Sequence, residues 1–137
     1  MERYCMRPED SGRPEDWFDH AEADLDAAEI LFKHGRNPAV AAMHIQQAAE
    51  KALKGFLIAR GWKLKRTHDL IQLLNQAVKY DSRFEKYRRF CEEATAYFFE
   101  ARYPLFISKR TYSKKEVRVS LKRVTALVHM AQGSEEE

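Results

Sequence analysis

The stretch PAVAAMHIQQAAEKALKGFLIAR, residues 38–60, decides the fold class of this chain. Apolar residues recur along it every three or four positions, which is the spacing of one face of an α-helix. The members of this face are Ala41, Ile45, Ala48, Ala49, Ala52, Phe56 and Ala59. Because most of them are small, a neighbouring helix can approach closely. The pattern therefore predicts a central helix over residues 38–60, ended by Gly61.

Four other segments have the same helical period, and none alternates for long with the period of a strand. Their apolar stripes are Trp17, Ala21, Leu25, Ala28 and Phe32; Leu70, Leu73, Leu74, Ala77 and Val78; Phe84, Tyr87, Phe90, Ala94, Tyr97 and Phe98; and Val117, Leu121, Val124 and Val128. The expected helices run over 16–34, 68–80, 82–101 and 114–131. Thr67 and Ser113 are the expected N-caps of the second and the last of these. The sequence predicts an all-α fold, an antiparallel bundle of four to five helices.

At 137 residues the chain has the size of one domain, and its composition, 45% hydrophobic and 33% charged, is globular. We expect a flexible N-terminal tail over 1–15, the helical domain over 16–131 and an acidic C-terminal tail over 132–137. No run approaches the roughly 18 apolar residues of a membrane span. Residues 1–16 lack the apolar segment of a secretory signal. The expected location is the cytoplasm.

The two cysteines, Cys5 and Cys91, have neither CxxC nor Cys/His metal spacing. We expect two free thiols in a reducing compartment, with no metal and no cofactor. The net charge of +3 permits an acidic partner without requiring one. Basic residues gather between Lys109 and Arg123, where they could contact RNA phosphates, although Tyr112 is the only aromatic residue among them.

The central stretch also carries a polar column. Its members, which fall within an arc of roughly 80° at about 100° per residue, are His44, Gln47, Lys51 and Lys54. Glu50 lies beside them. An imidazole, an amide and two ammonium groups in one column could bind a phosphate and a base edge together. The alternative is an ordinary solvated helix face, opposite the alanine-rich side.

Three other positions carry polar groups where chemistry could follow. Asp24 lies at the edge of an apolar stripe, where a carboxylate needs a partner such as Lys51 or Arg102, unless it is partly exposed. Arg102, followed by Tyr103, could form a phosphate-binding fork or simply cap its helix. His68, expected at the first position of its helix, could line an anion site or be an exposed residue of a capped helix.

Four blocks occur in a distinctive order along the chain. They are Ala23-Asp24-Leu25, the run HIQQAAEKALKG over 44–55, Thr67-His68-Asp69-Leu70 and Ala101-Arg102-Tyr103-Pro104. Together they resemble the HEPN family, the higher eukaryote and prokaryote nucleotide-binding domains, over about residues 16–131. The resemblance implies a helical bundle that usually forms homodimers. It also implies a protein partner, a minimal nucleotidyltransferase, in toxin–antitoxin-type pairs.

Many members of the resembled family are metal-independent ribonucleases that carry an arginine and a histidine with four to six residues between them. This chain departs from that motif. The residues four to seven positions after Arg102 are Phe106, Ile107, Ser108 and Lys109, and none is a histidine. Arg123 and His129 match the spacing, but they lie near the end of the last expected helix and point about 120° apart. We interpret that match as accidental. Enzyme activity stays open, and we favour the interpretation that the protein is not an enzyme.

Three functional hypotheses follow. In the first, the chain is a binding module for a nucleotide or RNA, associated with a nucleotidyltransferase and with a second copy of itself. Its site residues are His44, Gln47, Lys51, Lys54, Arg102 and Tyr103. In the second, it is a metal-independent ribonuclease with His44 or His68 as general base and Arg102 on the phosphate. In the third, it is a structural dimerisation protein in which Glu50 and Lys51 or Lys54 exchange ion pairs across a two-fold axis.

Overall fold

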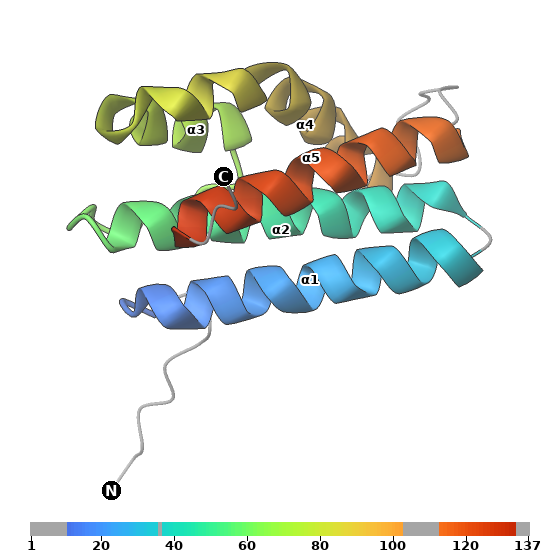
Figure 1. Ribbon diagram of the computed structural model, residues 1–137, viewed down its shortest axis with the longest axis horizontal. Helices are drawn as coiled ribbons and strands as arrows, with labels where there is room; N and C mark the ends of the chain where they lie inside the picture. The colour runs from blue at the N-terminus through green and yellow to red at the C-terminus, as the bar shows by residue number, and fades with distance from the viewer. Residues whose placement is uncertain (1–10, 36, 103–112, 134–137) are drawn as a thin grey trace, which may run out of the picture.

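The computed structural model describes residues 11–35, 37–102 and 113–133, with residues 97–102 described by their backbone alone. Over these residues it has five α-helices, one short 3-10 helix and no strand, which confirms the all-α fold (Figure 1). The elements are α1 (Pro14–His34), α2 (Pro38–Ile58), α3 (Leu70–Tyr80), the 3-10 helix η2 (Ser82–Tyr87), α4 (Arg88–Arg102) and α5 (Lys114–Gln132). None of the described helices could span a lipid bilayer.

Helix α2 is the central element of the bundle. It makes its most extensive contact with α1 and also packs against α3, α4 and α5. Helices α1 and α2 run in opposite directions, and α5 returns beside them in the direction of α2 (Figure 1). Helices α1 and α3 lie on opposite sides of α2 (Figure 1). A helix covered from several directions must be apolar or internally paired on most of its surface, which matters for the polar column of α2.

The apolar stripes expected from the sequence form the core as far as their side chains are described, which leaves out Tyr97 and Phe98. The fully buried residues among them include Ala21, Ala28, Ile45, Ala48, Ala52, Leu73, Phe84, Ala94, Val117 and Val124. Phe32, Val78 and Leu121 are only partly buried, and Ala59 is exposed beyond the end of α2. Cys91 is buried and free, and its burial raises the pKa of the thiol to about 12, so the thiol is neutral at physiological pH. Cys5 lies outside the described residues.

Side-chain caps set most helix starts. Asn37 accepts a hydrogen bond from the amide of Ala39 at 2.9 Å, and Ser113 accepts one from the amide of Glu116 at 3.1 Å, as expected for an N-cap. The expected cap of α3 is wrong. Asp69, rather than Thr67, accepts from the amides at the start of α3, because its carboxylate can take two of them at once.

Two helix boundaries differ by two residues from the expected ones. Helix α1 begins at Pro14 instead of about residue 16, and Ser11 before it is 5% exposed. The reason is a pair of contacts: the Ser11 carbonyl accepts from Trp17 Nε1 at 2.8 Å, and its hydroxyl donates to Asp16 at 2.7 Å. Helix α2 ends at Ile58, two residues early, before a turn in which Gly61 takes a positive φ of 86°.

The closest approach of α1 to α2 involves Gly55. A Cβ atom placed on Gly55 would lie 2.7 Å from Cε1 of Phe18 and 3.0 Å from its Cδ1. Carbon atoms do not approach that closely, so the absence of a side chain allows the Phe18 ring to lie against α2. The alanine-rich face predicted from the sequence therefore extends to a glycine at its C-terminal end.

We expect Gly55→Ala to lower the free energy of unfolding by about 1 kcal/mol, because displacing the ring costs more packing than alanine adds in helix propensity. In a Phe18→Ala background the same substitution should raise that free energy by about 0.5–1 kcal/mol, since only the propensity gain remains. Denaturant unfolding of the four proteins measures both differences. An equal loss in both backgrounds would contradict this account of the contact.

Candidate functional site

A carboxylate of α1 holds two basic side chains of α2. Asp24 Oδ1 lies 2.9 Å from His44 Nδ1, and Asp24 Oδ2 lies 2.6 Å from Lys51 Nζ. His44 and Lys51 are two helical turns apart, so they face α1 from the same side of α2. Lys51 is one of the two partners expected for Asp24. The side chain of the other, Arg102, lies outside the described residues.

The exposure of these three side chains leaves room for a ligand. The side chain of Asp24 is 12% exposed, against 28% for His44 and 24% for Lys51. An ionised carboxylate only accepts hydrogen bonds, so Nδ1 of His44 is the donor. Its Nε2 has no hydrogen-bond partner among the residues that the structure describes. The imidazole is thus oriented through one nitrogen and available through the other.

A second carboxylate, Glu50, lies inside the bundle with its side chain 4% exposed. Its Oε2 accepts from Lys54 Nζ at 3.1 Å, and its Oε1 lies 2.9 Å from His68 Nδ1. The amide of Gln46 reaches the same oxygen at 3.4 Å. Lys54 is as buried as Glu50, and its ammonium lies 5.3 Å from the centroid of the Trp17 ring. His68, 54% exposed, closes the cluster toward solvent.

The expectation that the polar column is a solvated face is therefore wrong for Glu50 and Lys54. The connection after α2 folds back so that His68 reaches Glu50, and Trp17 of α1 covers Lys54. The third hypothesis fails in its stated form for the same reason, because these two side chains are paired within the subunit and cannot exchange ion pairs with another copy. His68 also precedes the N-cap of α3 instead of occupying its first helical position.

The site residues expected from the sequence thus separate into four groups. His44 and Lys51 meet at Asp24, while Lys54 lies in the interior with Glu50. Gln47 is partly buried and donates to Gln46 at 2.8 Å. Arg102 by its side chain, and Tyr103 entirely, lie outside the described residues. The sequence pattern did not identify Gln46 as a hydrogen-bond partner of Glu50. The signal was available, because Gln46, Glu50 and Lys54 follow one another at intervals of four residues and so lie on one strip of the helix.

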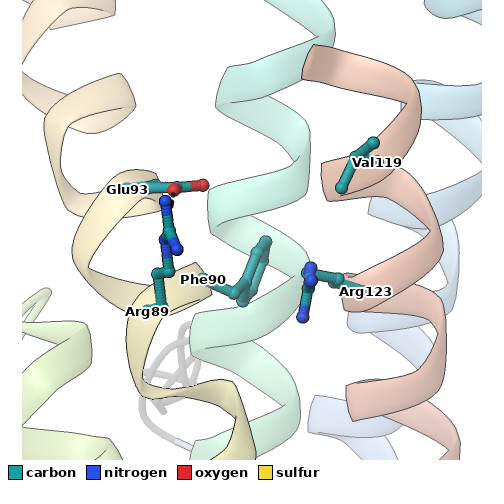
Figure 2. A pocket seen from close by; sticks show the side chains of 5 residues that line it. All are labelled: Arg89, Phe90, Glu93, Val119 and Arg123. Atoms are coloured by element: carbon teal, nitrogen blue, oxygen red, sulfur yellow. Dashed lines mark ion pairs between the residues drawn. The ribbon is translucent and has the colours of Figure 1, made fainter. Parts of the chain in front are cut away.

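Helix α5 carries Arg123 and His129, the residues that match the arginine–histidine spacing. Arg123 lines a hollow of about 280 Å³ between α4 and α5, together with Arg89, Phe90, Glu93 and Val119 (Figure 2). Arg89 and Glu93, one turn apart on α4, form an ion pair at 3.4 Å on the α4 side of this hollow (Figure 2). His129 does not line this hollow. No three His, Cys, Asp or Glu side chains in the described part of the chain are arranged to hold a metal ion.

We expect Glu50→Leu and Lys54→Met each to lower the free energy of unfolding by about 3 kcal/mol or more, because each leaves one buried charge without its partner. The double variant should be less destabilised than either single variant, since no buried charge remains. The exposed Arg89–Glu93 pair is the matched control, and Arg89→Met should change stability by about 0.5 kcal/mol or less. Thermal or urea unfolding measures these free energies. If the double variant loses as much stability as the two single variants together, the two charges are not coupled.

Comparisons with known proteins agree with this architecture. A profile of the HEPN domain matches residues 14–134 of the chain. The crystal structure of TT1696 from Thermus thermophilus is similar with a TM-score of 0.75 at 25% identity, covering 91% of this chain and 100% of that one. The structure of ST0689, an archaeal HEPN homologue, is similar with a TM-score of 0.70 at 25% identity, covering 88% of this chain and 96% of that one. No curated protein matches the chain in sequence. Since the profile spans nearly its whole length, the chain belongs to the HEPN domain family.

Proposed function

We propose that this protein is a HEPN module that binds the phosphate of a nucleotide or an RNA at the edge of α2 defined by His44, Gln47 and Lys51. One observation carries the proposal: a single carboxylate, Asp24, holds an imidazole and an ammonium group side by side, each about a quarter exposed. Donors that are already oriented lose less conformational freedom when a ligand binds. Such an edge suits a small anionic group with several acceptor oxygens.

The electrostatics of this edge favour a small anion over an extended acidic surface. Asp24 neutralises Lys51, so the edge offers directed donors without a large excess of positive charge. Lys51 keeps ammonium protons beyond the one given to Asp24, and phosphate oxygens accept them well. Lys54 is excluded from the binding set because Glu50 and Trp17 enclose it. Arg102 and Tyr103 complete the set in our proposal, as the family pattern implies.

The proposal extends to partners. HEPN membership supports a homodimer and association with a minimal nucleotidyltransferase in a toxin–antitoxin-type pair, as the family resemblance implies. The α2 edge proposed here does not need Glu50 or Lys54 at a dimer interface, since these two side chains pair with each other inside the subunit. Sedimentation of the chain alone, and with a candidate nucleotidyltransferase, separates the two associations.

We expect calorimetric titration with ATP, GTP and a short single-stranded RNA to show binding by the wild type. His44→Ala/Lys51→Ala should weaken that binding by at least about tenfold, because the ammonium contact of Lys51 is lost together with the contact that His44 Nε2 donates when both of its ring nitrogens are protonated. Adding Asp24→Asn removes the carboxylate that the double variant leaves unpaired, and it separates lost binding from lost folding. Lys79→Ala, which removes an exposed ammonium of α3, is the control and should bind as the wild type does. Unchanged affinity in the triple variant would refute this assignment of the site.

A second candidate function is metal-independent RNA cleavage, favoured by the Asp24–His44 contact at 2.9 Å. A carboxylate that orients one ring nitrogen prepares the other to accept the proton of a ribose 2′-hydroxyl as it attacks the adjacent phosphate. His68 has the same kind of partner in Glu50, and it is more exposed. In this candidate Arg102 would stabilise the charge on phosphorus, as the resemblance implies.

If the protein is a ribonuclease of this kind, it should cleave RNA in the presence of EDTA. His44→Gln should then lower the cleavage rate by about a hundredfold, the lower end of general-base effects, while His68→Gln should matter less. Gel analysis of a labelled RNA gives the rates. Intact RNA after long incubation at high protein concentration would rule this activity out.

A further inference from the structure

A groove runs between α1 and α5. It has a volume of about 380 Å³ and is lined by Glu29, Phe32, Lys33, Arg118, Leu121, Lys122 and Thr125. Three of these are cations and one is an acid, so the groove is positive. Lys114, one helical turn before Arg118, adds a fourth cation above the Phe32 ring.

The cations of this groove differ from those of α2 in having no acidic partner within the part of the chain that the structure describes. Lys33, Lys114, Arg118 and Lys122 are all exposed, and none forms an ion pair with another described residue. By contrast, Lys51 and Lys54 each contact a carboxylate. An exposed cation without a partner keeps its whole charge for a ligand, and clustered cations of this kind are what phosphate backbones bind.

The groove also contains an aromatic ring that comes from outside the basic stretch of the sequence. Phe32, from the last turns of α1, lies under two side chains of α5: Arg118 Cζ is 5.6 Å and Lys114 Nζ 5.8 Å from its ring centroid. The ring is partly buried, so one part of it remains open to the groove. A ring beside a guanidinium plane gives two flat surfaces against which a nucleobase can stack.

From these observations we propose that the α1–α5 groove binds a single-stranded RNA segment, with a base against Phe32 and consecutive phosphates along Lys114, Arg118 and Lys122. These three residues recur every helical turn, about 6 Å apart along α5, which is comparable to the separation of successive phosphates in a strand. The proposal rests on RNA as the ligand class of the protein and adds a second contact surface, distinct from the α2 edge. A protein partner is less well matched, because Phe32 and Leu121 are the groove's only large apolar side chains.

Fluorescence anisotropy with a labelled 12-nucleotide oligouridine, titrated at several salt concentrations, tests the proposal. Arg118→Gln/Lys122→Gln should weaken binding by at least tenfold and lower the slope of log affinity against log salt by about 1.4, which is 0.7 for each lost phosphate contact. Phe32→Leu should weaken binding several-fold with the salt slope unchanged, while Phe32→Tyr, which keeps the ring, should weaken binding less than Phe32→Leu. Lys63→Gln/Lys79→Gln removes the same charge from exposed positions elsewhere and is the control.

The outcomes separate this inference from the proposed α2 site. If the groove variant behaves like the control while the Asp24/His44/Lys51 triple variant loses RNA, the groove proposal is wrong and the α2 proposal stands. If only the groove variant loses RNA, the groove proposal stands and RNA is excluded as the ligand of the α2 edge, whose nucleotide binding is tested by the titration with ATP and GTP. If the wild type binds poly-glutamate but not oligouridine, the groove serves an acidic protein and the RNA proposal is overturned. Circular dichroism of each variant verifies folding, and Phe32→Tyr keeps the test valid if Phe32→Leu unfolds.

Discussion

The burial of one carboxylate, Glu50, constrains much of the bundle. A buried charge without a partner costs several kcal/mol, so the segments around it have to supply donors. Lys54 and Gln46 do so from α2 itself, and His68 does so from the connection that leads to α3. Lys54 in turn lies against Trp17, whose indole holds the Ser11 carbonyl. A chain of contacts thus links the start of α1, the middle of α2 and the return toward α3.

The basic residues of α2 differ in kind from those of the α1–α5 groove. Lys51 and Lys54 of α2 have carboxylate partners and contribute to folding before they can contribute to binding. The groove's cations are exposed and form no ion pair with another described residue; they are Lys33, Lys114, Arg118 and Lys122. A phosphate at the α2 edge would meet oriented but neutralised donors, whereas a phosphate at the groove would meet full positive charges. The first surface suits selectivity for a small group, and the second suits affinity for a strand.

The chemistry open to this HEPN domain depends on which histidine can act. The family's ribonuclease spacing after Arg102 has no histidine here, and His129 does not line the hollow that Arg123 lines. Each of the two histidines that the polar blocks contain, His44 and His68, has a carboxylate on Nδ1 instead. Such pairing serves structure and proton transfer equally well, because it fixes the ring in either case. The contact between Asp24 and His44 is therefore compatible with His44 acting as a general base, but it does not require that role.

The sequence alone determined the helices, because a 3.6-residue apolar period needs no knowledge of distant residues. The stripes of α1, α2 and α3 and the cap at Ser113 are local features of this kind, and the structure confirms them. Periodicity shows which face of a helix is polar, but not what covers that face. Only the tertiary structure decided that Glu50 and Lys54 are interior, that Asp24 joins His44 to Lys51, and that Phe32 lies beneath Arg118, a residue from the far end of the chain. Each of these depends on long-range packing, where burial changes a solvated charge into one that must be paired.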